Sequence, residues 1–408
     1  MTRSACRGCS ARNLIPILSL GRTPLANALL SEVDLDRPEP TYPLDLVFCE
    51  LCSLVQITVD VPPRELFEEY LYHSSYSDTM VAHARRLAQR IAREESLGRE
   101  SLVIEVASND GYLLKNYIDL EVPVLGIEPA RNIAAIARDH GVETVGSFFG
   151  LELARSLRDS GRLANVVHAH NVLAHVPDLG GVLEGMGEIL AQNGIVVIEV
   201  PYVRELVERC EFDTIYHEHL SYFSLNALVA VAKAAGLIVH DVERVSIHGG
   251  SLRVFLSRPG TRPVGSYVDE LLAEEGSIGL TRSDFYADFA ARVKGLRAAL
   301  VSTLADLKRD GASIAAYGAA AKGATLLNYA GVDAQTIDFV SDRSPHKQGR
   351  YMPGAHIPIV APTALLERRP DFCLLLAWNF ETEILVQQSA YRAAGGRFII
   401  PVPTVRIL

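Results

Sequence analysis

The chain carries two Cys-x-x-Cys pairs far apart in the sequence, and together they constrain how its first part can fold. The pairs are Cys6 with Cys9 and Cys49 with Cys52. Each pair turns two thiolates toward one point, so two pairs supply the four ligands of a tetrahedral zinc ion at ~2.3 Å. The segment between the pairs must therefore loop out and return. Four thiolates leave no open position for a substrate, so we expect a structural metal.

The residues around the second pair predict strands on either side of a turn. Residues 42–48 and 54–57 are rich in Leu, Val, Ile and Phe, which is typical of short strands. This pattern predicts a zinc-ribbon-like domain. Four unrelated reduced thiols, or a redox Cys-x-x-Cys, remain alternatives. We expect Cys210 and Cys373, which stand alone, to be core residues.

Composition excludes several classes of protein. The chain has 408 residues and a formal net charge of -10, which argues against nucleic acid as a partner. An uninterrupted apolar run of ~20 residues is missing from the sequence, so we expect no membrane span. The first residues do not resemble an export signal, and we expect a cytoplasmic protein. We expect the partner to be a small-molecule substrate, and the protein to be a monomer or weak dimer.

The pattern of strands and helices predicts an α/β protein of three domains, at residues 1–75, 76–245 and 246–408. In the second domain, alternation of buried strands and amphipathic helices predicts βαβ units and a parallel sheet. The expected strands are 102–106, 122–127, 165–170 and 194–200, and the expected helices are 80–92 (capped by Ser77 or Asp78), 133–140 and 179–190. The third domain repeats the pattern on a smaller scale, with strands 248–255, 313–317, 337–340, 372–377 and 397–400 and a long helix over 283–309.

The first strand-to-helix turn of the second domain predicts a cofactor site. Glu105 lies near the end of a strand and Gly111 near the start of a helix, and such a turn places backbone N–H groups beside a ligand. Glu128 ends the next strand and is placed to accept hydrogen bonds from ribose. NAD and S-adenosylmethionine both fit this pattern. Asp110 would repel a pyrophosphate, so we favour S-adenosylmethionine. The expected cofactor residues are Glu105, Ala107, Ser108, Asn109, Asp110, Gly111, Glu128, Pro129 and Asn171.

Residues 216–219 form a Tyr-His-Glu-His run inside an apolar stretch. Burying four such groups is costly unless each has a partner or a task, so we predict that this run is the chemical centre. If the run is extended, Tyr216 and Glu218 face away from His217 and His219. The side chains on one face would then serve only for packing, and we expect His217 to be one of them. A His-x-His metal site is a weaker alternative.

Ordered motifs along nearly the whole chain resemble those of the sugar C-methyltransferases of bacterial deoxysugar and antibiotic pathways, typified by the tetronitrose C-3'-methyltransferase. The resemblance rests on the four cysteines of the two pairs and on segments 72–75, 108–111, 126–129, 174–178, 216–224, 248–253 and 317–323. The cofactor turn has Ala107 where we expect glycine. The resemblance implies S-adenosylmethionine-dependent methylation of a carbon of a nucleotide-linked 4-keto-deoxysugar.

The implied reaction assigns roles to the run. A sugar carbon becomes nucleophilic once the proton beside the ketone is removed. We assign His219 as the base, Glu218 as its partner, and Tyr216 as a donor to the enolate oxygen or a pocket residue. We expect His175 to help hold the sugar, although a structural histidine is also possible.

The third domain is expected to help hold the nucleotide-sugar, with a diphosphate on the turn before Lys322. The expected substrate residues are Tyr72, Ser75, Tyr76, Tyr222, His248, Tyr317, Gly318, Lys322, Arg343 and Lys347. The plainer alternatives are that the tyrosines only pack, that His248 caps a bend in a strand, and that the charged loop is simply exposed. Three other functions stay open: a methyltransferase with another acceptor, an NAD-dependent nucleotide-sugar epimerase or dehydrogenase, and an inactive zinc-containing binding module. The spacing of Tyr317 and Lys322 does not fit the Tyr-x-x-x-Lys pair of the dehydrogenase class.

Overall fold

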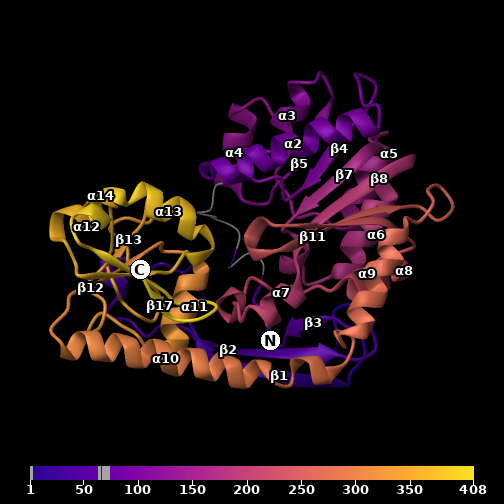
Figure 1. Cartoon of the computed structure of the whole chain (residues 1–408). Coiled ribbons are helices and arrows are strands. Elements are labelled where there is room, and N and C mark those ends of the chain that lie inside the picture. Colours follow the sequence, from indigo (N-terminus) through magenta and orange to yellow (C-terminus); the bar gives the residue numbers. More distant parts are fainter. Residues whose placement is uncertain (1–2, 63–65, 67–73) are drawn as a thin grey trace.

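Three sheets organise the protein, and each belongs mainly to one third of the chain. A computed structural model describes residues 3–62, 66 and 74–408, and Figure 1 shows the N-terminal sheet below the central sheet, with the C-terminal sheet to one side. The α/β class is confirmed, as is the order of a zinc-binding region, a Rossmann-like region and a smaller α/β region. Among the described residues, we find no helix long and apolar enough to cross a bilayer.

The N-terminal sheet has four antiparallel strands in the order β1-β2-β3-β9. Their bounds are Leu14–Thr23 (β1), Tyr42–Cys49 (β2), Val55–Ile57 (β3) and Ser221–Tyr222 (β9). The expected strands on either side of the second cysteine pair are confirmed. The fourth strand comes from far along the chain: Tyr222 pairs with Val55, and Ser221 pairs with Gln56. The residues directly after the Tyr-His-Glu-His run are therefore part of the zinc-binding domain's sheet.

The central sheet has seven strands in the order β10-β11-β8-β7-β4-β5-β6. The parallel strands are Val103–Val106 (β4), Val124–Ile127 (β5), Thr144–Val145 (β6), Ala164–His170 (β7) and Leu190–Pro201 (β8). Ile238–Val245 (β10) and Ser251–Ser257 (β11) extend this sheet with antiparallel pairing. We expected residues 248–255 to open the third domain, but β11 pairs with β8. The proposed division after residue 245 thus falls between two paired strands.

Helices cover both faces of the central sheet because its strands are apolar on both sides. One face packs against Asp78–Glu94 (α2), Lys115–Ile118 (α3) and Arg131–Asp139 (α4), and the other against Leu151–Asp159 (α5), Leu179–Ile189 (α6) and Leu225–Ala234 (α8). The expected first helix is confirmed as α2, and its cap is Ser77, whose hydroxyl accepts a hydrogen bond from the Met80 amide. A side-chain cap of this kind satisfies one of the open N–H groups of a first turn.

The C-terminal sheet has the order β14-β13-β12-β15-β16-β17. Its strands are Ile314–Tyr317 (β12), Val340–Ser341 (β13), Ile359–Val360 (β14), Phe372–Leu375 (β15), Arg397–Ile400 (β16) and Arg406–Ile407 (β17), and its helices are Ala321–Ala330 (α11), Thr363–Arg368 (α12), Glu381–Gln387 (α13) and Ser389–Ala393 (α14). The strand expected at 337–340 is shifted: β13 begins at Val340, although the Asp338 amide already donates to the Ile314 carbonyl at 2.9 Å.

Three further helices join these parts. They are Val203–Glu208 (α7), Ser266–Ser277 (α9) and Phe289–Arg309 (α10). We expected one helix over 283–309, but residues 283–286 form a separate short 3-10 turn before α10 starts. In Figure 1, α10 runs along the base of the molecule beside β1, and α11 also packs on β1. The C-terminal domain is thereby fixed against the zinc-binding domain.

Candidate active site

A cavity of about 820 Å³ lies where the three domains meet. All three contribute to its wall, and the carboxyl ends of the central parallel strands open into it, which is where doubly wound sheets bind ligands. Of the expected site residues, twelve line the cavity: Ala107, Asn109, Glu128, Pro129, Asn171, His175, Tyr216, Glu218, His219, Tyr222, Lys322 and Lys347. Residues expected from separate motifs therefore converge on one space.

Backbone geometry explains the cofactor turn that follows β4. Ala107, Asn109 and Gly111 have φ of +54°, +49° and +79°, in the left-handed region where glycine is most at ease. This accounts for our expectation of glycine at position 107. Gly111 has a second constraint, since an added Cβ would lie 2.7 Å from a methyl carbon of Val142.

Glu128 is held by the turn itself. Its Oε2 accepts from the Asn109 amide at 3.0 Å and its Oε1 from the Ala130 amide at 2.9 Å. Burial raises the pKa of Glu128, and the two amide hydrogen bonds oppose that rise. The carboxylate is fixed at the cavity wall, as a ribose acceptor must be.

Three carboxyl groups surround the turn. Glu105 and Asp110 are buried, and Glu105 Oε2 and Asp110 Oδ1 find no hydrogen-bond partner among the described residues. Burial, together with the charges of Asp110 and Glu128, raises the pKa of Glu105 well above its usual value. A cationic ligand relieves such a cluster, whereas a pyrophosphate would aggravate it. The residues present thus fit S-adenosylmethionine, which carries a sulfonium and an ammonium.

The segment before α2 closes over this turn. The Ser74 amide donates to Asn109 Oδ1 at 2.9 Å, and the Ser75 amide donates to Asp110 Oδ2 at 3.1 Å. Ser75 does not line the cavity, so it contributes through its backbone. Tyr72 lies outside the described residues, and so do the side chains of Tyr76 and His248, and their expected roles stay predictions.

The Tyr-His-Glu-His run forms a turn and is not extended. Within that turn, His219 Nδ1 lies 2.9 Å from the Thr214 carbonyl oxygen, and Nε2 lies 2.9 Å from the Tyr216 hydroxyl. A carbonyl only accepts, so the proton of a neutral ring sits on Nδ1 and Nε2 carries the lone pair. His175 packs edge-on against His219 with ring centroids 4.9 Å apart. The lone pair of His219 is thus presented at the cavity wall.

The two other members of the run face in different directions. His217 does not line the cavity. Its ring lies against Tyr42, with Nε2 3.3 Å from the Pro43 carbonyl. Glu218 lines the cavity, and its Oε1 accepts from Asn27 Nδ2 at 2.7 Å. Burial raises the pKa of Glu218 to about 7. Burial also lowers the pKa of His175 to about 4. At neutral pH the site therefore holds an uncharged His175 and a half-ionised Glu218.

On the C-terminal side, Lys322 and Lys347 reach the cavity. Lys347 Nζ donates to the Ala319 carbonyl at 2.7 Å. Lys322 Nζ donates to Asn379 Oδ1 at 2.9 Å and lies 4.4 Å from the ring centre of Trp378. Burial lowers the pKa of Lys322, and the charges of Asp213 and Glu211 oppose that shift.

Three residues expected at the substrate lie elsewhere. Tyr317 and Gly318 belong to the C-terminal core, where an added Cβ on Gly318 would lie 2.8 Å from the Ala377 Cβ. Arg343 is exposed and lies 3.9 Å from Glu383. The turn they flank still reaches the cavity through Ala320 and Ala321. In the sequence, a strand's last residue and a loop cation looked equivalent to true lining residues, because residue type does not show which way a side chain points.

The sequence analysis missed two acidic residues at the boundary with the C-terminal domain. Glu211 lines the cavity, and its Oε1 has no hydrogen-bond partner among the described residues. Asp213 is buried and accepts from Trp378 Nε1 at 2.6 Å. Burial raises the pKa of Glu211 to about 7 and that of Asp213 to about 6. The available signal was two acids on either side of Phe212, shortly before the Tyr-His-Glu-His run.

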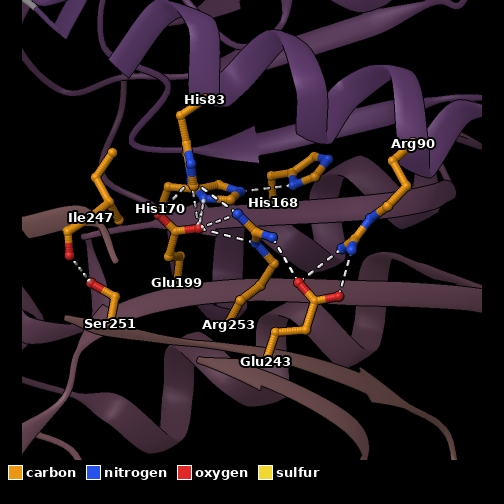
Figure 2. Close-up of polar contacts among 9 residues, drawn as sticks. All are labelled: His83, Arg90, His168, His170, Glu199, Glu243, Ile247, Ser251 and Arg253. Carbon is orange, nitrogen blue, oxygen red and sulfur yellow. Dashed lines mark hydrogen bonds and ion pairs between the residues drawn. The ribbon is translucent and has the colours of Figure 1, made fainter. Parts of the chain in front are cut away.

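A buried polar row crosses the central sheet and was also missed (Figure 2). His170, Glu199, Arg253 and Glu243 are direct neighbours on β7, β8, β11 and β10. Glu199 accepts from Arg253 Nε at 3.0 Å and lies 3.0 Å from His83 Nε2 of α2. Burial alone would raise the pKa of Glu199, but the His83 hydrogen bond and the neighbouring positive charges lower it to about 2.

This row reaches the cavity at His170. Burial lowers the pKa of His170 to about 4, against the attraction of Glu199. The ring is therefore neutral, and its Nδ1 faces Glu199 Oε2 at 3.8 Å. Its Nε2 lies 2.9 Å from His168 Nδ1. Tyr117 completes the chain, with its hydroxyl oxygen 2.7 Å from His168 Nε2.

The four cysteines lie together as the two pairs predicted. Their sulfur atoms all lie within 4.8 Å of one another. Cys6 and Cys52 are 3.4 Å apart, and Cys9 and Cys49 are 3.5 Å apart. Tetrahedral zinc with bonds of ~2.3 Å separates its sulfur ligands by about 3.8 Å. The arrangement fits a closed, structural zinc site.

Three protein families match successive parts of the chain. They are a zinc binding domain at residues 6–67, a methyltransferase domain at 80–242 and a C-methyltransferase C-terminal domain at 246–403. The C-methyltransferase NovU of Streptomyces niveus is 38% identical over 404 residues, which cover 99% of this chain and 96% of that protein. This chain belongs to the C-methyltransferase family. The expected resemblance is confirmed, and with it an enzyme that uses S-adenosylmethionine and binds zinc.

Two weaker similarities cover smaller shares of this family member. An ubiquinone biosynthesis O-methyltransferase of Azorhizobium caulinodans is 28% identical over 97 residues, covering 24% of this chain and 38% of that protein. The solved structure of the PH0226 protein of Pyrococcus horikoshii covers 48% of this chain and 98% of its own, with 14% identity and a TM-score of 0.38.

Proposed function

We propose that this C-methyltransferase methylates a carbon beside the ketone of a nucleotide-linked 4-keto-deoxysugar, with C-3 as the methylated position and His219 as the base. The observation that carries the proposal is the orientation of His219 in the cavity wall. Nδ1 is committed to the Thr214 carbonyl, so Nε2 is the basic nitrogen and faces the Tyr216 hydroxyl. A ring oriented by a carbonyl is the arrangement that a general base requires.

Carbon methylation needs three things from the protein: a base, a donor for the developing enolate oxygen, and a fixed relative position of both reactants. S-adenosylmethionine supplies an electrophilic methyl group. His219 removes the proton beside the ketone through Nε2. The Tyr216 hydroxyl, which donates to Nε2 in the present structure, turns to the substrate oxygen and leaves the lone pair accessible. Glu218 shares the proton load because its own pKa lies close to neutrality.

The C-terminal domain is placed to hold the nucleotide. The first residues of α11, Ala321 and Lys322, line the cavity, and Lys347 reaches it from a following loop. A helix N-terminus and two ammonium groups suit a diphosphate. Glu211 and Asp213 lie close enough to Lys322 to act on its charge, so we place the diphosphate nearer to Lys347 and the α11 amides than to Lys322.

The test separates proton removal from methyl transfer. Wild-type protein and His219→Gln are incubated in D2O with a thymidine-diphosphate 4-keto-6-deoxysugar, with and without methyl-labelled S-adenosylmethionine. We expect wild type to exchange the proton beside the ketone and to transfer the label. His219→Gln should bind S-adenosylmethionine normally but lose both reactions by about 10²–10⁴-fold.

His356→Gln serves as the matched control because His356 does not line the cavity, and its half-exposed ring lies 2.6 Å from Glu39 Oε1. We expect this variant to behave as wild type. Retained exchange in His219→Gln would remove His219 as the base. Absence of exchange and transfer in wild type with every keto sugar tried would instead refute the sugar acceptor.

A further inference from the structure

The zinc-binding domain holds the segment that carries His219 from several directions. Asn27 donates to Glu218 Oε1 at 2.7 Å. The Ile57 amide donates to the Leu220 carbonyl at 3.1 Å, and Ser221 and Tyr222 then pair with β3 as the last strand of the N-terminal sheet. From the other side, the Leu220 amide donates to the Ala174 carbonyl at 2.6 Å. The peptide that follows His219 is thus clamped between the two domains.

One arginine of the first cysteine pair takes part in this clamp. Arg7 lies between Cys6 and Cys9, and its side chain has 0% exposure. Its Nη1 donates to the carbonyls of Ile57 at 2.5 Å and Leu220 at 3.3 Å. Its Nη2 donates to the Val59 carbonyl at 3.2 Å and to Asp60 Oδ1 at 2.5 Å. The guanidinium therefore joins the metal-binding turn to the residue next to His219.

The shape of the arginine side chain matters here. A guanidinium presents five N–H groups in a rigid plane, whereas an ammonium is a point donor with three. Nη1 of Arg7 reaches the β3 end and Leu220 while Nη2 reaches Val59 and Asp60, and a lysine cannot reproduce that fork. Backbone contacts also fix the turn, because the Arg7 amide donates to Gln56 Oε1 at 2.9 Å.

The position of Arg7 depends in turn on its two neighbours. Cys6 and Cys9 sit opposite Cys52 and Cys49 at 3.4 and 3.5 Å. The four cysteines form no disulfide, so without a metal ion no bond joins the first pair to the second. We therefore expect zinc binding to hold the turn that carries Arg7 in this shape.

We propose that Arg7 is a positioning residue for the loop of residues 216–222, through which zinc binding sets the orientation of His219. This inference rests on the proposed role of His219 as the base. It gives the zinc site a function beyond stabilising its own domain: the metal holds a catalytic loop that belongs to the central domain.

Arg7→Lys tests the proposal and Arg3→Lys is its matched control. Arg3 also pairs with Asp60, with Nε 3.0 Å from Oδ2, but its side chain is 31% exposed. Among the described residues, the Arg3 side chain makes no hydrogen bond with Leu220 or Ile57. For each variant we would measure zinc content, the melting temperature, the Kd of S-adenosylmethionine, kcat and KM. Histidine labelled with ¹³C at Cε1 gives an NMR signal for His219, assigned by its loss in His219→Gln.

We expect Arg7→Lys to keep one zinc per chain and wild-type cofactor affinity, to shift the His219 signal, and to lower kcat by about tenfold to 10²-fold with little change in KM, since small displacements of a catalytic group act on the chemical step. Arg3→Lys should match wild type in all of these. A wild-type His219 signal and kcat in Arg7→Lys would overturn the proposal.

A second measurement needs no variant. Zinc is withdrawn stepwise from wild-type protein with a chelator, and the His219 and His356 signals are followed together. The proposal expects the His219 signal to change in step with zinc loss while the His356 signal stays in place, and an unchanged His219 signal after zinc has left would overturn it. If His219→Gln proves active, the base assignment fails, but both NMR experiments still decide whether Arg7 and zinc position this ring.

Discussion

At the scale of single residues, the site depends on carboxyl groups that the fold removes from water. Glu218 is the clearest case, because it is 3% exposed and its Oε2 has no hydrogen-bond partner among the described residues. Burial raises the pKa of Glu218 from 4.5 to about 7, although Asn27 and Lys347 oppose the rise. Between these values the folded protein binds this proton more tightly than the unfolded chain does.

This shift predicts how pH affects stability. Because the pKa of Glu218 is raised on folding, its proton stabilises the folded protein fully below pH 4.5. This stabilisation is lost as pH rises through about 7. We expect Glu218→Gln to become more stable relative to wild type by about 2–3 kcal/mol between pH 5 and pH 8. Urea unfolding at each pH measures the difference. Parallel stability curves for the two proteins would contradict a buried, titrating Glu218.

Asn27 offers a second test at this scale. Its amide donates to Glu218 Oε1, and a hydrogen bond to the ionised form favours ionisation. Asn27→Ala should therefore raise the pKa of Glu218 further. Carboxyl ¹³C NMR, with the Glu218 signal assigned through Glu218→Gln, measures this pKa directly. A lower pKa in Asn27→Ala would show that water replaces the amide more effectively than we expect.

At the scale of elements, the polar row of Figure 2 fixes α2 to the central sheet. His83 and Arg90 of α2 contact Glu199 and Glu243 on two strands, with Arg253 between them. The start of α2 follows the residues that close over the cofactor turn. Loss of the row should therefore loosen the cofactor side of the cavity.

We predict that Glu199→Gln lowers the unfolding free energy by about 3–5 kcal/mol, because it breaks a buried ion pair. Arg253 then keeps only the more exposed Glu243 as a carboxylate partner among the described residues. Guanidinium chloride unfolding measures the change. The control is Glu188→Gln, whose partners Arg155 and Arg158 are largely exposed, and which should cost less than about 1 kcal/mol. Equal losses of unfolding free energy in the two variants would show that the polar row contributes no more to stability than an exposed ion pair does.

At the scale of the whole molecule, the cavity exists only because three domains meet. Lys322 of the C-terminal domain lies beside Glu211 and Asp213 of the central part, and residues 221–222 extend the N-terminal sheet. The site therefore lies at an interface between domains, and a change in how the domains pack should alter its geometry directly.

Lys322→Met tests that docking. Burial raises the pKa values of Glu211 to about 7 and Asp213 to about 6, so both acids are mostly neutral at pH 5 and ionised at pH 8. Loss of the nearby ammonium should destabilise the protein at pH 8 by several times more than at pH 5. Thermal unfolding at both values measures this, and an equal effect at the two pH values would contradict the assignment.

Metal analysis supplies the last test. Wild type should contain about one zinc per chain, and Cys52→Ser should lose it, because three thiolates bind zinc far more weakly than four. Cys373→Ser is the control, since Cys373 is buried in the C-terminal core away from the cluster. Wild-type protein that folds fully without metal would refute the zinc site.

Much of the fold could be predicted, because apolar periodicity and turn chemistry act locally. The strands at 103–106 and 164–170, the cap at Ser77 and the cysteine cluster all follow from short stretches of sequence. Strand β11 was assigned to the wrong neighbours, since an isolated apolar strand does not say which sheet it joins. Arg343 and Tyr317 were placed at the substrate for a similar reason: residue type does not reveal the direction of a side chain.

The sequence by itself determined which groups could do chemistry: four thiolates in two pairs, an acid-rich cofactor turn, and an imidazole beside a phenol and a carboxyl. Those are properties of side chains and their spacing. Only the tertiary structure decided that the run is a turn and not a strand, that Asn27 and Glu211 line the same cavity, and that Arg7 contacts the residue after His219. Such choices depend on contacts between segments up to 213 positions apart, and no local preference encodes them.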